Sequence, residues 1–123
     1  MKKRYCRVFS DEQGESHAEE VDAELQLTDY APPAPAVFVS RPTAAAGFVF
    51  VVAPKASVGD FHPTPGRQLQ VVLRGEAEVE TSNGTVMRGH PGDVFMFEDT
   101  HGRGHRSTVV GDQALEILAV SFI

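Results

Sequence analysis

The side chains that could do chemistry in this chain are two histidines at the borders of strand-like runs. His62 lies in "GDFHPTPGRQLQVVLRGEAEVE", just ahead of Gln68, and His105 follows the glycine-rich stretch "THGRG". No G-x-S-x-G motif is present, Cys6 has no partner suggested by the sequence, and no two carboxylates stand at a convincing catalytic spacing. Any catalysis would therefore be general acid/base or metal-assisted, with His62 or His105 as the proton carrier or metal ligand.

Short strand-like runs separated by turn residues must position these side chains. The runs are "GFVFVVA", "RQLQVVLR", "EAEVET", "TVMR", "DVFMF", "RSTVV" and "LEILAVSFI". Turn residues such as Ser82-Asn83-Gly84 and Pro91-Gly92 stand between them. Many short strands at such regular spacing predict an all-β fold, either a barrel or a double-sheet jelly roll.

The first part of the chain has a different pattern. Apolar and acidic residues alternate from Glu20 to Leu27, which predicts an edge strand, although the same residues are good helix formers and a helix is the competing interpretation. The stretch "YAPPAPAVFVSRPT" cannot be helical because of its prolines. We therefore expect residues 1–35 to form an N-terminal extended arm or edge segment packed on a barrel made by residues 36–123.

Length and charge narrow the function classes. The 123 residues fit one domain with one core. A formal charge of -6 argues against a nucleic-acid partner. No apolar run approaches the roughly 18 residues of a membrane span, and the N-terminal stretch lacks the apolar core of a signal peptide. With Cys6 as the only cysteine, we expect a cytoplasmic protein with no membrane partner.

The order H-x2-P-x-R-Q, G-E-x-E-V, P-G-D-V and E-D-T-x-G-x-G-H resembles the cupins, and in particular small stand-alone ones. Cupins are small β-barrels with two motifs, the first of which usually runs G-x5-H-x-H-x3-4-E-x6-G. His62, Thr64, Gln68 and Gly75 fall on its later positions. In this chain Thr64 replaces one motif histidine, Gln68 replaces the glutamate, and Glu98 replaces the proline of the second motif. The resemblance implies a cupin-type double-sheet β-barrel.

The resemblance also implies a ligand set. Cupin ligands converge inside the barrel mouth, so His62, Gln68 and His105 are the expected positions for a divalent metal, whether Zn, Fe, Ni, Mn or Cu. Two imidazoles and a neutral amide make a thin set. Glu98 could add a carboxylate, but its neighbour Asp99 is equally placed and only one of them can share that face. The alternative is metal-free, with these side chains making structural hydrogen bonds.

Strand parity suggests which side chains line the cavity. Gln68, Gln70 and Val72 share one face, and either Val94 and Met96 or Phe95 and Phe97 must face the same space. Arg67 could bind a carboxylate or phenolate, or it could form a surface ion pair. The expected ligand-binding residues are Thr64, Arg67, Gln70, Met96 and Glu98.

These patterns lead to two expectations of function. The first is a small-molecule-binding cupin that acts on an organic metabolite as a metal-assisted isomerase, lyase or oxygenase. The alternative is a metal-free, non-enzymatic binding or sensing module, so the sequence leaves open whether the protein is an enzyme. The exposed segment "APPAPAVFVS" could pair with a neighbouring subunit's sheet edge, which predicts a homodimer.

Overall fold

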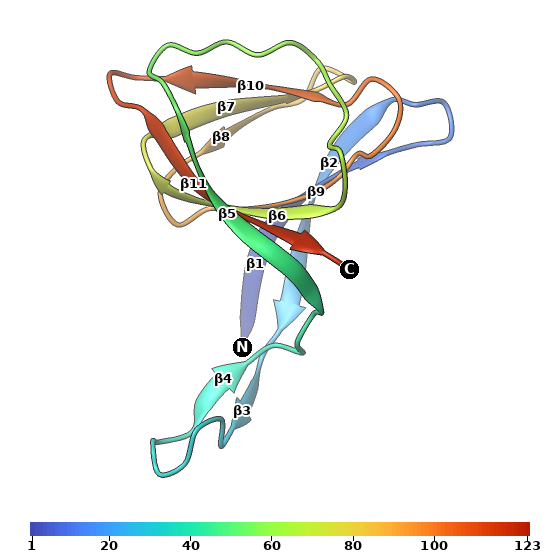
Figure 1. Cartoon of the computed structure of the whole chain (residues 1–123). Helices are drawn as coiled ribbons and strands as arrows, with labels where there is room; N and C mark the ends of the chain where they lie inside the picture. Colours follow the sequence, from blue (N-terminus) through green and yellow to red (C-terminus); the bar gives the residue numbers. More distant parts are fainter.

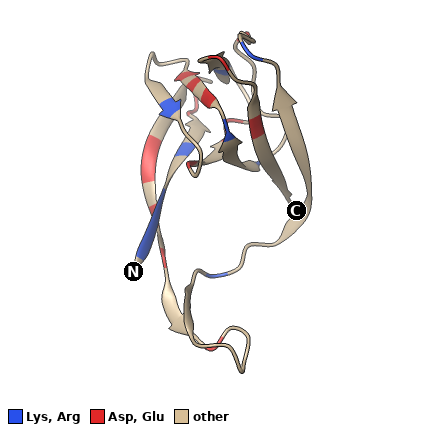
Figure 2. Cartoon of the chain, turned by 90° about the vertical axis from the view of Figure 1, so that its left-hand side faces the viewer, with Lys and Arg blue, Asp and Glu red and all other residues tan.

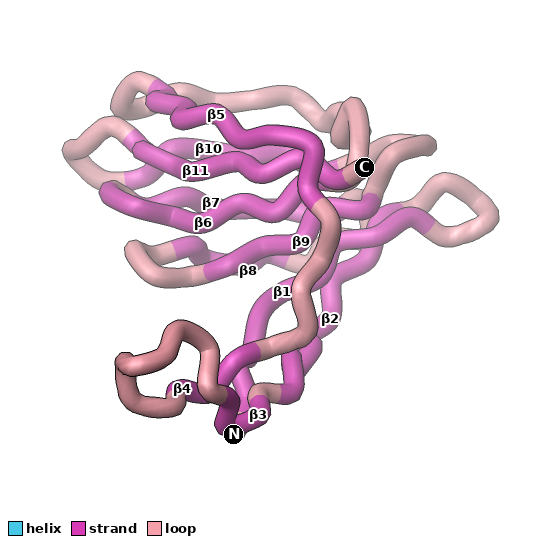
Figure 3. Tube along the Cα trace, turned by 60° about the horizontal axis from the view of Figure 1, so that its bottom comes forward, coloured by secondary structure: helices cyan, strands magenta, loops and turns pink.

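The computed structural model describes residues 1–123, and all of its regular elements are β-strands (Figures 1 and 3). It contains no helix that is long and apolar enough to span a bilayer. The eleven strands are β1 (Lys2–Ser10), β2 (Ser16–Glu24), β3 (Gln26–Thr28), β4 (Val37–Val39), β5 (Ala45–Ala53), β6 (Gln68–Arg74), β7 (Glu76–Thr81), β8 (Val86–Gly89), β9 (Val94–Glu98), β10 (His105–Val110) and β11 (Leu115–Phe122).

Two sheets face each other and form the barrel (Figure 1). The larger sheet has the order β2-β1-β9-β6-β11-β5 and the smaller one β10-β7-β8. The connection between β5 and β6 continues the smaller sheet, because isolated bridges join Val58 to Thr108 and His62 to His105 of β10. The prediction of an all-β double-sheet jelly roll is confirmed, and each of the seven predicted runs forms a strand.

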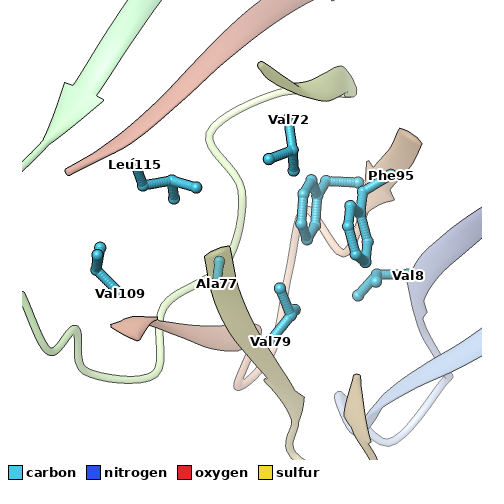
Figure 4. Close-up of a cluster of buried hydrophobic side chains, with 8 residues drawn as sticks. Val8, Val72, Ala77, Val79, Phe95, Val109 and Leu115 are labelled. Atoms are coloured by element: carbon cyan, nitrogen blue, oxygen red, sulfur yellow. The ribbon is translucent and has the colours of Figure 1, made fainter. Parts of the chain in front are cut away.

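The core lies between the two sheets and is built by period-two alternation (Figure 4). In β7, Ala77, Val79 and Thr81 are buried while the intervening glutamates are partly exposed. Each fully buried valine or phenylalanine stabilises the fold by about 1.5–3 kcal/mol relative to an exposed one. The core cluster comprises Val8, Val72, Ala77, Val79, Phe95, Phe97, Val109 and Leu115.

The first 35 residues divide into two structural parts. β1 and β2 belong to the larger sheet, where β1 pairs antiparallel with β2 and parallel with β9, and Val8 of β1 is fully buried. The segment from Glu20 is strand up to Glu24 and β2 is an edge strand, which confirms the strand interpretation over the helix. β3 and β4 form a hairpin that projects from the barrel (Figures 1 and 3). The expected boundary between residues 35 and 36 falls in the loop of this hairpin.

Candidate functional site

A buried carboxylate organises the polar end of the barrel interior. Phe95 and Phe97 of β9 point into the core, and Asp99 continues the same alternation just beyond the strand, with 0% of its surface exposed. Its Oδ1 accepts a hydrogen bond from Thr64 Oγ1 at 2.8 Å, and its Oδ2 lies 2.6 Å from His105 Nδ1. The backbone N–H of Thr64 also donates to the Asp99 carbonyl at 2.9 Å. Asp99 therefore ties β10 to the loop before β6.

This contact determines the hydrogen bonding of the His105 ring. An ionised carboxylate can only accept, so His105 Nδ1 carries the proton and the lone pair of the neutral ring stays on Nε2. The ring is 5% exposed and stacks on Phe97, with 4.3 Å between the centroids. The Nε2 atom of His105 makes no hydrogen bond within the protein. Because every fully buried side-chain nitrogen or oxygen has a hydrogen-bond partner, Nε2 is not fully buried and reaches solvent.

His62 lies beside His105 because the two backbones form a small antiparallel bridge. The His62 N–H donates to the His105 carbonyl at 3.0 Å, and the reverse bond is 3.1 Å long. Gly104 makes this approach possible, since its φ is +73° and a Cβ there would lie 1.9 Å from the His62 carbonyl oxygen. The ring of His62 is exposed, its centroid is 5.1 Å from that of His105, and its Nδ1 is 2.9 Å from the Pro63 carbonyl oxygen.

Two glutamines line the inner face of β6. Gln68 stands opposite Phe97 and Gln70 opposite Phe95 in the antiparallel pair with β9, and cross-strand partners share a face. Both glutamines are half-buried although they face inward, so this end of the barrel interior is open to solvent. The amide nitrogen of Gln70 donates to the amide oxygen of Gln68 at 2.7 Å.

Three of the expected site residues lie elsewhere. Met96 and Glu98 have the opposite parity to Phe97, so both point to the outer face of the larger sheet. Glu98 accepts hydrogen bonds from Arg7 and from Arg67, the latter at 2.6 Å. Arg67 therefore forms the surface ion pair that was the alternative for it. Asp99, not Glu98, is the carboxylate that faces the interior, and the sheet separates Glu98 from His105.

The pKa of Glu98 reflects this outer arrangement. Burial alone would raise the pKa of this carboxyl, but the hydrogen bonds from Arg7 and Arg67, together with their charges, outweigh burial and hold the pKa below its usual range. Glu98 is thus an ionised carboxylate whose oxygens are committed to two guanidinium groups. The two ion pairs of Glu98 connect β9 to Arg7 of β1 and to Arg67, which directly precedes β6.

The donors at the barrel opening do not fit a resident divalent metal. No group of three or more His, Cys, Asp or Glu side chains is arranged to hold an ion. Asp99 is occupied by Thr64 and His105, and the Gln68 amide oxygen already accepts from Gln70. The two Nε2 atoms of His62 and His105 remain, and two neutral imidazoles offer no negative charge to balance a divalent cation.

The two facing sheets, with a histidine directed into the open end, define a small single-domain jelly-roll barrel. The chain belongs to the cupin family: the model described as "Cupin domain" matches residues 48–121. No curated protein matches it.

Solved structures of two cupins are similar to this chain. One is a Cupin 2 conserved barrel domain protein from Salinispora arenicola, which is 20% identical, with 80% of this chain and 76% of that chain covered and a TM-score of 0.50. Another is the Cnp3 cupin domain of Schizosaccharomyces pombe, at 14% identity, with 99% and 84% covered and a TM-score of 0.49. The likeness to the Salinispora protein, at 20% identity, concerns the fold alone.

The structure brings together His62, Thr64, Gln68, Gln70 and His105 among the expected residues. It adds Asp99 and the ring of Phe97. The alternation of Phe95, Phe97 and Asp99 was the available signal for both. This alternation did not decide which face points inward. Val94 and Met96, on the other face of the strand, are also apolar, and the next residue on their face is Glu98.

Proposed function

We propose that this cupin binds a small organic molecule at the open end of its barrel without a metal ion, and that His105 Nε2 is the main polar contact. The observation that carries the proposal is the hydrogen bond from the ring to the fully buried Asp99, which directs the Nε2 lone pair toward solvent. A polar atom held by a buried partner and exposed at one end is the usual specificity element of a small-molecule site.

The surroundings of Nε2 indicate the chemical class of the ligand. A neutral Nε2 accepts a hydrogen bond, so the ligand needs a hydroxyl or N–H group there. The paired amides of Gln68 and Gln70 supply further donors and acceptors. Val49 and Val51 face the same interior from β5, since they pair with Ala119 and Ile117, and they are 56% and 39% exposed. A small metabolite with one polar end and one apolar end suits this lining.

A general acid/base enzyme is the second candidate. It is favoured by the carboxylate–imidazole pair, in which Nε2 could accept a substrate proton while Asp99 stabilises the resulting imidazolium. Such proton transfer would serve an isomerase or lyase step. His105 would then move a proton between two positions of a bound substrate while Asp99 stabilises the imidazolium, and the glutamine amides would orient the substrate.

Metal content is the first measurement. Untagged protein purified without chelator is analysed by plasma mass spectrometry, beside the double variant His62→Ala/His105→Ala. We expect far less than one ion per chain in both proteins. About one ion per wild-type chain that disappears in the double variant would overturn the metal-free proposal.

Ligand binding is the second measurement. A panel of small hydroxy, keto and amide metabolites is screened by NMR, with the ring signals of His105 as the reporter. We expect hits to shift these signals and His105→Ala to lose most of the affinity, while His90→Ala on the exposed turn before β9 leaves it unchanged. Hits incubated in D2O separate the two candidates, because incorporation of deuterium at carbon reports proton transfer and its absence reports binding alone.

A cytoplasmic location remains part of the proposal. Cys6 is the only cysteine, so no disulfide can form within the chain. Burial, with a smaller contribution from the charge of Glu20, raises the pKa of the thiol to about 11, which keeps it protonated. A chain that forms no disulfide within itself suits a reducing compartment.

A further inference from the structure

Charged residues are almost absent from one continuous part of the chain. Between Leu25 and Pro54 only Asp29 and Arg41 are charged, whereas the 123 residues contain 11 Lys and Arg and 17 Asp and Glu. This region comprises the β3–β4 hairpin with its connection to β5, which we call the arm (residues 25–44), and β5 itself. Figure 2 shows that the colours of charged residues gather on the barrel and on β1 and β2, whereas the arm and β5 are nearly free of them.

The arm exposes large apolar side chains and is not packed on its own barrel. β3 and β4 pair only with each other, and the hairpin extends away from both sheets (Figures 1 and 3). Its large apolar residues are about half exposed or more: Leu27, Tyr30, Val37 and Phe38. An apolar hairpin held out in this way lacks the burial that normally offsets the entropy of ordering it.

β5 is an exposed, apolar edge strand. It is the last strand of the larger sheet and pairs only with β11, so one of its edges is free. Its residues 45–52 are all exposed, although none is charged and none is proline. A long apolar edge strand of this kind normally carries a charge or proline, or is covered by another segment.

The outer face of β5 and β11 contains a hollow that fits a large side chain. Small residues leave space at one side of the hollow, namely Ala45, Ala46 and Gly47. Its walls are formed by the larger side chains of Phe48, Phe50, Leu118 and Val120. The hollow has a volume of about 430 Å³ and is lined by apolar residues alone apart from the glycine. A phenylalanine or tyrosine ring is the kind of group that such a surface binds.

We infer that a second copy of this chain covers this surface. Around a two-fold axis, the arm of each chain lies over the outer face of β5 and β11 of its partner, and Phe38 enters the partner's hollow. The contact is isologous, so one exchange covers both apolar surfaces at once. The arm and β5 carry almost no charge, and Glu116 is the one charged residue of β11, on the same face as Leu118 and Val120. This composition matches the core of a dimer interface, where charged residues are depleted.

The exposed area is sufficient for a stable dimer. A fully exposed aromatic side chain presents about 200 Å². With exposures of 70%, 49%, 65% and 71% for Tyr30, Phe38, Phe48 and Phe50, these four side chains supply roughly 500 Å² per chain, or about 1,000 Å² for two chains. The exposed valines and Leu27 add to this, which reaches the range of about 1,200–2,000 Å² typical of specific interfaces.

Sedimentation equilibrium of the full chain tests the inference. The wild type is compared with Phe38→Glu in the arm and Phe50→Glu in the wall of the hollow. Val86→Glu is the control, because Val86 is 53% exposed on β8 of the other sheet. We expect a wild-type dimer, a dissociation constant raised on the order of a hundredfold by each test variant, and no change in the control. Circular dichroism verifies that each variant is folded, as expected for exposed positions.

Cross-linking between chains identifies the surfaces directly. In a Cys6→Ala background, one preparation carries Phe38→Cys and a second carries Ala46→Cys, and the two are mixed under oxidising conditions. We expect a disulfide-linked heterodimer of one chain from each preparation. A monomer at micromolar concentration would refute the inference, and so would a dimer that both glutamate variants leave intact or that forms no such cross-link. A monomer would assign the apolar surface to a different protein partner.

Discussion

Asp99 determines which nitrogen of His105 is available to a ligand. Its carboxylate has two partners, Thr64 and the His105 Nδ1, and it is completely buried. A carboxylate so placed acts as a positioning group, because it fixes the tautomer and the orientation of the ring while the ring makes the contact. The chemistry proposed above therefore depends on a residue that no ligand needs to touch.

Asp99→Asn should change the tautomer of His105. The asparagine amide can donate to Nδ1, which an aspartate cannot, so the proton of the neutral ring is expected to move to Nε2. Nitrogen-15 NMR of the ring, at a pH where it is neutral, distinguishes the two tautomers. We also expect a loss of about 1–3 kcal/mol in the free energy of unfolding from the altered buried hydrogen bonds.

Asp93→Asn is the control for this experiment. Its carboxylate lies 3.5 Å from His90 Nδ1, but both side chains are about half exposed, so water competes for every hydrogen bond. The signals of His105 should not respond to it. An unchanged tautomer in Asp99→Asn would show that the carboxylate does not position the ring.

Glu98 leads to a prediction about stability and pH. Its lowered pKa means that the ion pairs with Arg7 and Arg67 stabilise the fold above the ordinary glutamate pKa of 4.5, and that this contribution is lost as the pH falls through the lowered value. Glu98→Gln should therefore reduce the free energy of unfolding by about 1 kcal/mol at pH 7, and the deficit should shrink toward pH 3.

Urea titrations of wild type and variant at both pH values measure this deficit. Glu116→Gln is the control, because Glu116 lies on β11 and forms no ion pair. Glu98→Gln should leave ligand binding unchanged, since Glu98 lies outside the barrel. A deficit that stays constant between pH 7 and pH 3 would contradict the assignment of the effect to the charge of Glu98.

At the scale of the elements, the turn before β10 brings the two histidines together. Gly104→Ala places a methyl group against the His62 carbonyl, so the bridge between His62 and His105 must open. Gly111→Ala is the matched control: its φ of +81° is equally unfavourable for alanine, but a Cβ there meets nothing within 4 Å. Both variants carry the backbone strain of alanine at positive φ, so the difference between their free energies of unfolding measures the steric contact alone.

We expect Gly111→Ala to cost about 1–2 kcal/mol of stability and Gly104→Ala at least about 2 kcal/mol more. Thermal and urea unfolding measure both. Gly104→Ala should also alter the His62 ring signals in NMR spectra, which Gly111→Ala should not. Equal losses in the two variants would refute the role assigned to this turn.

The strands of the barrel were predictable from the sequence because their pattern is local. Alternation in β7 and turn residues at the strand ends identify them without knowledge of their partners. β1 was not predicted, since only Val8 is fully buried in its nine residues and its pairing with β9 joins segments about 90 residues apart. Such a non-local contact leaves no local pattern.

The lack of a local pattern also explains why the site was predicted only in part. His62, Gln68 and His105 occupy recognisable motif positions, but whether Asp99 or Glu98 faces inward depends on the phase of β9. Val94 and Met96 could have formed the inner set as well as Phe95 and Phe97, because both sets are apolar. The phase is decided by packing against β1 and β6, where Arg7 and Arg67 draw Glu98 to the outer face.

For the whole molecule, dimerisation should make thermal stability depend on concentration. If two chains unfold together with loss of the interface, mass action raises the Tm as the protein concentration increases. We expect this rise for the wild type and for Val86→Glu but not for Phe38→Glu. Differential scanning calorimetry over a hundredfold range of concentration, on the order of what such an equilibrium needs, makes the comparison. A Tm independent of concentration in all three would contradict it.

The connection between β5 and β6 has a consequence for how quickly a ligand enters and leaves. It is held to β10 by a few backbone hydrogen bonds, at Ser57, Gly59 and His62, rather than by a continuous ladder. A segment attached in this way can detach without unfolding of the barrel, at a free energy below that of global unfolding. Because His62 belongs to this segment and lies beside His105, its detachment would act as a gate, and the residence time of a ligand would follow the rate at which the gate opens.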